Sequence, residues 1–157
     1  ERRLPLRVSI RGQMDHSLHL VVKEVLSAAG FSLEDITSWG GQVRYDPGLP
    51  KGPNRLGAMQ RGEVDMIIDE AVHNWLNVAL ESGMHVLPLD ESMLTQLEAL
   101  GFQRAVLPKA DYPKLDSDVP TLDFSGFPVY THVNVPDSIV TAVCGALEAR
   151  KEKIVWQ

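Results

Sequence analysis

The chain has 157 residues, of which 44% are hydrophobic and 23% charged, and its formal net charge is −6. This composition is typical of a globular protein with a sizeable core, and it excludes disordered, collagen-like and coiled-coil chains. The acidic balance argues against nucleic acid as the main partner, no apolar run approaches the roughly 20 residues of a membrane span, and the single cysteine excludes an internal disulfide.

The first predicted elements are a strand and a helix joined by a short polar turn. Residues 6–10 alternate apolar and polar side chains, which favours a strand. Residues 18–29 repeat apolar side chains at the helical period, with Asp15 or Ser17 placed to cap the start and Gly30 at the end. This stripe predicts a helix that packs against the strand.

The middle of the chain alternates breakers, helices and strands. Residues 39–53 are rich in glycine and proline and predict a loop with at most a short strand inside it. A short helix over 55–61 and an apolar strand over 64–68 follow, and such a strand is typical of a parallel sheet buried on both faces. A second helix is expected over 72–80 and another strand over 85–89.

The last third continues the same alternation. Asp90 is placed to cap a third helix that ends at Gly101, and a strand is expected over 102–107. A polar loop and an extended segment lead to a last helix beginning at Pro136, in which Cys144 lies among apolar residues and is expected to be a buried, inert thiol. The order of elements predicts an α/β fold with a mostly parallel sheet flanked by helices.

The most promising ligand site is the turn between the first strand and the first helix. In open α/β sheets, ligands bind beyond the carboxyl ends of the strands, where helix N-termini point. Free backbone amides and the helix dipole favour binding of an anion such as a carboxylate. Arg11 can also form a bidentate, charge-assisted hydrogen-bonded pair with that carboxylate. A plain connecting turn with a surface arginine is the alternative. The expected site residues here are Arg11, Gly12, Gln13, Asp15, His16 and Ser17.

Two further features are candidates for the same site. Asp69 and Glu70 follow the strand over 64–68, and in a parallel sheet they lie at the same edge as Arg11. They can hold an ammonium group, a cation or Arg11 itself, or they can simply be the first-turn acids of the next helix. Trp39, beside two glycines in an irregular segment, is a candidate to stack on a ligand or a partner.

The sequence offers little for catalysis. His16 and His19 are three residues apart, but no third ligand stands at a diagnostic spacing and no His-Glu-x-x-His or cysteine pair occurs. The serines lack a Gly-x-Ser-x-Gly elbow, and neither a P-loop nor a Gly-x-Gly-x-x-Gly pattern supports nucleotide binding. We therefore expect no catalytic residue, no metal and no cofactor, and predict that the protein is not an enzyme.

Four sequence stretches, in order, resemble one family of receptors. They are Ala-Ala-Gly-Phe-Ser-Leu-Glu-Asp-Ile (28–36), Met-Gln-Arg-Gly-Glu-Val-Asp (59–65), His-Val-Leu-Pro-Leu-Asp (85–90) and Tyr-Pro-Lys-Leu-Asp-Ser-Asp-Val-Pro-Thr (112–121). Together they are similar to the TAXI-type extracytoplasmic solute receptors of TRAP transporters. The resemblance implies a type II periplasmic-binding-protein lobe. Two ligand-facing turns depart from the family, because Arg11 to Asp15 replace a Gly-Ser-Gly-Thr-like turn and Asp69 to His73 replace a Gly-x-Pro turn.

The resemblance also implies an organisation and a set of partners. Residues 1–109 correspond to the second lobe of a two-lobe receptor and residues 110–157 to a segment that returns towards the first lobe. We expect the chain to be a fragment that lacks this N-terminal lobe, since the first residues contain no signal peptide. The implied partners are a small anionic or zwitterionic solute, such as a glutamate-like carboxylate, and membrane transporter subunits, in the periplasm. A ligand-sensing regulatory domain on the same fold and, less favoured, a metal- or histidine-dependent enzyme are the alternatives.

Overall fold

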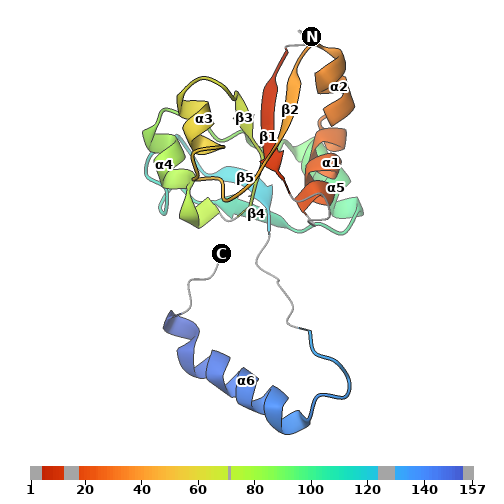
Figure 1. The fold of residues 1–157 in the computed structure, drawn as a ribbon, viewed down its shortest axis with the longest axis vertical. Helices are drawn as coiled ribbons and strands as arrows, with labels where there is room; N and C mark the ends of the chain where they lie inside the picture. Colours follow the sequence, from red (N-terminus) through yellow and green to blue (C-terminus); the bar gives the residue numbers. More distant parts are fainter. Residues whose placement is uncertain (1–4, 13–17, 71, 124–129, 154–157) are drawn as a thin grey trace. The chain divides into compact units, whose positions relative to one another are not determined.

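The structure of the protein is a computed structural model that describes residues 5–12, 18–70, 72–123 and 130–153 (Figure 1). The chain divides into two compact units, Glu1–Asp123 and Phe124–Gln157, and each is described by itself. The division at residue 109 that the resemblance implies concerns the lobes of a receptor, and it stays a prediction.

The first unit is built on a three-stranded parallel sheet. Strand β1 (Arg7–Arg11) lies in the centre, with β2 (Gln42–Asp46) on one side and β3 (Met66–Ile67) on the other. Val8 is opposite Val43 in β2 and opposite Met66 in β3. The prediction of an α/β fold with parallel strands flanked by helices is confirmed.

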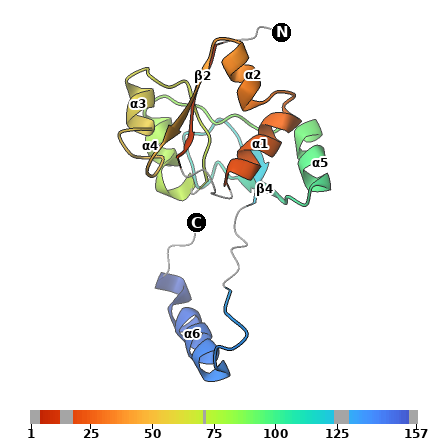
Figure 2. The same cartoon turned by 45° about the vertical axis from the view of Figure 1, so that its right-hand side comes forward.

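Helices α1 (Leu18–Ala28), α2 (Leu33–Ser38) and α5 (Glu91–Ala99) lie on one side of this sheet (Figures 1 and 2). The apolar stripe predicted for the first helix is confirmed, because it supplies three buried side chains to the core. Residues of α1, α2 and β1 form this core, from which water is almost completely excluded: Val8, Ile10, Leu18, Val22, Leu26 and Ile36. The arrangement buries the face of the central strand that the α1 stripe was expected to cover.

On the other side of the sheet lie α3 (Leu56–Gln60) and α4 (Leu76–Glu81), with the 3₁₀ turn η1 (Val72–Asn74) between them in the chain. Strands β4 (Arg104–Leu107) and β5 (Val119–Leu122) form a separate antiparallel pair. A second core cluster joins α4 to the loop before β5 and contains Leu76, Tyr112, Leu115 and Val119.

Three of the expected elements differ from the structure. The strand expected over 64–68 is confined to Met66–Ile67, although the amides of Asp65 and Ile68 also donate to β1. No strand forms over 85–89, although the amide of Leu89 donates to the carbonyl of Pro120 at 3.1 Å. The helix expected over 72–80 is split into η1 and α4, with Trp75 between them. Some apolar residues of these segments do pack on a core cluster, among them Met66, Val72 and Val86. Leu87, however, is 70% exposed, so the alternating pattern over 85–89 did not indicate a buried strand.

The second unit contains α6 (Asp137–Arg150) and the short η2 (Lys151–Lys153). The helix confirms the predicted start at Pro136. However, none of its residues is buried, and Cys144 is exposed. The prediction of a buried thiol was wrong, because no described residue of this unit covers the apolar stripe of the helix. None of the helices in the described residues has the length and apolar character needed to cross a bilayer.

Candidate functional site

The carboxyl ends of the three parallel strands bring charged side chains together at one edge of the sheet. Arg11 ends β1 and lies opposite Asp46, which ends β2. Asp69 follows β3 by two residues, after Ile68 has donated its amide to the carbonyl of Ser9. The sequence prediction that Arg11 and Asp69 meet at one edge is therefore confirmed in its geometry.

Asp69 is the centre of this group. Its carboxylate has no exposed surface and accepts hydrogen bonds from two guanidinium groups. Arg11 donates from Nε and Nη2, at 3.2 and 2.5 Å, and Arg55 donates from Nη1. The amide of Glu70 adds a fourth contact at 2.9 Å. Four donors around one buried carboxylate satisfy its acceptor capacity.

Arg55 is the least expected member of the site. It precedes α3, its side chain has no exposed surface, and it contacts Ser9 in β1 and Ile68 just after β3. Nε donates to the hydroxyl of Ser9 at 3.2 Å, and Nη2 donates to the carbonyls of Ser9 and Ile68 at 3.4 and 3.0 Å. Its guanidinium therefore joins two strands through backbone groups and Asp69 through charge.

The network continues to the outer strand. The hydroxyl of Ser9 donates to Asp46 at 2.7 Å, and Asp46 in turn accepts from Arg44 at 3.1 Å. Ser9 and Asp46 are both buried. Every buried side-chain nitrogen or oxygen in the described residues has a hydrogen-bond partner, which is the condition under which buried charges are tolerated.

Arg11 lies on a partly exposed side of this edge and lines a pocket there. Its side chain is 12% exposed, and besides Asp69 it contacts Glu70 at 3.4 Å. The hydrogen bonds with Asp69, and secondarily the charges of Asp69 and Glu70, raise the pKa of the Arg11 guanidinium against the opposing effect of burial. Of the possibilities considered for the two acids, the structure shows that they hold Arg11. They are not first-turn acids, since neither η1 nor α4 has an acidic residue in its first turn.

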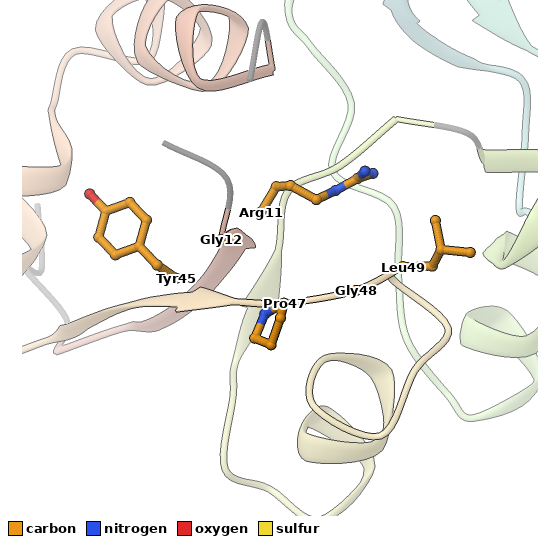
Figure 3. A pocket seen from close by; sticks show the side chains of 6 residues that line it. All are labelled: Arg11, Gly12, Tyr45, Pro47, Gly48 and Leu49. Carbon is orange, nitrogen blue, oxygen red and sulfur yellow. The ribbon is translucent and has the colours of Figure 1, made fainter. Parts of the chain in front are cut away.

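A shallow pocket of about 370 Å³ opens beside this charged edge (Figure 3). Arg11 and Gly12 from the end of β1 line it together with the residues that leave β2: Tyr45, Pro47, Gly48 and Leu49. Tyr45 and Leu49 lie at opposite ends of the pocket in Figure 3, with Arg11 between them, and both are about half exposed. The middle of the glycine- and proline-rich segment over 39–53 therefore forms a wall of the pocket.

The remaining expected site residues do not contribute to the pocket as predicted, or they lie outside the described residues. The amide of Gly12 donates to the carbonyl of Asp46 at 2.9 Å, so it is engaged in the sheet and is not a free donor. Trp39 packs on the first core cluster and against Phe31, with 5.7 Å between ring centroids, and is not placed to stack on a ligand in the pocket. Gln13, Asp15, His16 and Ser17 lie outside the described residues.

The histidines do not assemble a metal centre in the part of the chain that the structure describes. His19 contacts the carbonyl of Arg11 at 2.6 Å, and His73 contacts the hydroxyl of Tyr112 at 2.7 Å. Within the described residues, no group of three or more histidine, cysteine or acidic side chains has an arrangement that could hold a metal ion.

Comparisons of the chain with protein-family profiles, with curated proteins and with solved structures found no match in any of the three.

Proposed function

We propose that this chain is the solute-binding lobe of an extracytoplasmic receptor of the TAXI type, which captures a small carboxylate for a TRAP-type membrane transporter. The type II periplasmic-binding-protein lobe, the periplasmic location, the missing N-terminal lobe and the transporter subunits as partners belong to this proposal. It is supported by the four sequence stretches that resemble the family and by a parallel sheet whose carboxyl edge carries the candidate site.

The observation that carries the proposal is the guanidinium of Arg11 beside the pocket. Nε and Nη2 are held by Asp69, while Nη1 has no acceptor among the described residues. A guanidinium fixed in this way loses little entropy when a carboxylate binds to its remaining edge. A small polar pocket with one oriented cation suits binding without bond chemistry, and closure of two lobes over the solute is the corresponding mechanism.

Calorimetric titration of the 157-residue chain with acetate, succinate and glutamate tests the proposal. We expect millimolar binding, because one lobe supplies only part of the contacts, and no heat with acetamide, which has the shape of acetate without its charge. Substitution of Arg11 by Ala should weaken binding at least about 10-fold, in line with the loss of a charge-assisted hydrogen bond. The matched control is Arg7→Ala at the opposite end of β1, which should leave affinity within about twofold.

Three outcomes contradict the proposal in different ways. Micromolar binding by the chain alone would show that it is not half of a site. Equal affinity in the Arg11 and Arg7 variants would remove Arg11 from the site. Absence of binding by every carboxylate, both in this chain and in a complete receptor that contains it, would refute solute capture itself.

A further inference from the structure

We infer that Arg55 sets the electrostatic state of the candidate site. By neutralising the buried carboxylate of Asp69, it leaves the positive charge of Arg11 available to an anion in the pocket. The identity of that anion as a solute carboxylate rests on the proposed function, whereas the charge relation between the three side chains can be tested without any solute.

The contacts of Arg55 give this role its physical basis. Arg55 and Asp69 have no exposed side-chain surface, whereas the side chain of Arg11 retains 12%. The Oδ2 atom of Asp69 accepts from both guanidinium groups. One carboxylate therefore bridges a fully buried cation and the cation that lines the pocket, whereas Arg55 itself is not among the residues that line it.

The charges at this edge can be grouped by their contacts. Asp46 is paired with Arg44 and hydrogen bonded to Ser9, so it contributes no net charge. Arg11, Asp69 and Arg55 together carry one positive charge. Glu70 balances it, through a contact of 3.4 Å that is the longest around Arg11. A solute carboxylate at Arg11 therefore meets a triad that is still cationic, with a more distant acid beside it.

Loss of Arg55 would change this balance without touching the pocket. Asp69 would then form an ion pair with Arg11 alone, and the net charge of that pair would be zero. At an effective dielectric constant of about 20, a unit charge at a separation of about 8 Å changes an equilibrium roughly 30-fold before screening by solvent and salt. Arg55 is nearer than this to Arg11, because both guanidinium groups bind Oδ2 of Asp69. We therefore expect an effect of about 10-fold on processes that depend on the charge of Arg11.

The first experiment measures Arg11 directly, by modification with phenylglyoxal and peptide mass mapping. The reagent attacks the neutral guanidine, so its rate falls when the guanidinium form is stabilised. Arg61, an exposed residue paired with Glu63, serves as internal reference. In Arg55→Met we expect labelling of Arg11 to fall about 10-fold relative to Arg61. In the double variant R55M/D69N, and in Arg55→Lys, it should stay within about threefold of the unmodified chain.

Each variant tests a different part of the inference. Unchanged labelling in a folded Arg55→Met chain, judged by circular dichroism, would overturn it. If Arg55→Met does not fold, labelling of R55M/D69N still tests whether Arg55 contributes charge to the site. If Arg55 contributes no charge to the site, removing Asp69 together with it would raise Arg11 labelling about 10-fold instead of leaving it near the starting rate. A disturbed rate in Arg55→Lys would show that the shape of the guanidinium, not its charge, is what matters.

The second experiment separates this inference from the proposed function. Succinate titrations of the same variants should show affinity that falls about 10-fold in Arg55→Met and returns in R55M/D69N. If labelling follows the expected order but no carboxylate binds, the proposed function fails and the role of Arg55 stands. If succinate binds the unmodified chain but neither labelling nor affinity responds to Arg55, the role of Arg55 fails and the proposed function stands.

Discussion

Substitution of Asp69 by Asn should be one of the most destabilising conservative changes in this protein. The two side chains have nearly the same size, but the amide is neutral and directs hydrogen atoms towards one of the two guanidinium groups. Arg55 would keep its charge at a position without exposed surface. Removing one partner of a buried ion pair costs about 3–5 kcal/mol, mostly because the remaining charge is left uncompensated.

A matched control stands four residues earlier in the chain. Asp65 also accepts hydrogen bonds from an arginine, Arg7, at 2.5 and 2.9 Å, but the two side chains are 36% and 40% exposed. Exposed pairs of this kind contribute about 0–1 kcal/mol because solvent screens them. Asp65→Asn should therefore lower the free energy of unfolding by no more than about 1 kcal/mol.

Urea denaturation at neutral pH, followed by circular dichroism, compares the two substitutions. The expected difference between them is at least 2 kcal/mol, which clearly exceeds the error of linear extrapolation for one protein measured under one set of conditions. If Asp69→Asn costs less than 1 kcal/mol, Asp69 is not buried between two arginines. That outcome would remove the basis of the candidate site.

Two further predictions concern the frame around the site. At Gly41, which leads into β2, a Cβ would overlap the carbonyl oxygen of Leu6 and come within 2.8 Å of the Ile36 carbonyl. Gly41→Ala should therefore cost at least about 2 kcal/mol in thermal or urea unfolding. Gly57→Ala should be nearly neutral, because the one tight contact of a Cβ there is with the flexible end of the Arg61 side chain. Hydrogen bonds from Arg7 lower the pKa of Asp65 below its ordinary 3.8. The stability that this pair contributes should therefore be complete above about pH 4 and should be lost as the pH falls through the lowered pKa. If Asp65→Asn shows the same dependence of unfolding free energy on pH as the unmodified chain, this prediction is wrong.

The parts of the fold that could be predicted are those in which one residue pattern has one structural solution. The stripe of α1 is an example, because apolar residues at the helical period have no other way to be buried together. Helix α2 was missed although its signal was present. Ser32 and Asp35 form a reciprocal capping box, with the hydroxyl of Ser32 accepting from the amide of Asp35 at 3.1 Å and the amide of Ser32 donating to the Asp35 carboxylate at 2.9 Å. A search for that four-residue pattern would have found the helix start.

The loop beyond β2 was harder to interpret from its residues. Glycine and proline establish that no regular element continues after Asp46, but they do not say where the chain goes next. The structure shows that its first residues return along the end of β1 and form one wall of the pocket. Such a placement depends on the register between β1 and β2, which a single sequence does not reveal.

Arg55 is the residue of the site for which sequence reasoning had the least direct signal, yet charge balance would have identified it. Once a parallel sheet is predicted, Asp46, Asp69 and Glu70 all stand at the carboxyl edge and require cations, because buried carboxylates are not left alone. Arg11 supplies one. Arg44 precedes Asp46 by two residues on the same face of an extended strand and is its natural partner.

A third cation is needed at this edge, and Arg55 and Arg61 are the two candidates among the nearby arginines. Arg61 has Glu63 two residues further on, and the structure confirms that these two pair with each other at 2.7 Å on the surface. Arg55 has no acid within five residues on either side, so its charge must be met by a residue distant in the chain. A charged residue without a local partner, next to the apolar start of a short helix, thus indicates a long-range ion pair. Here that pair is the one on which the charge of the candidate site depends.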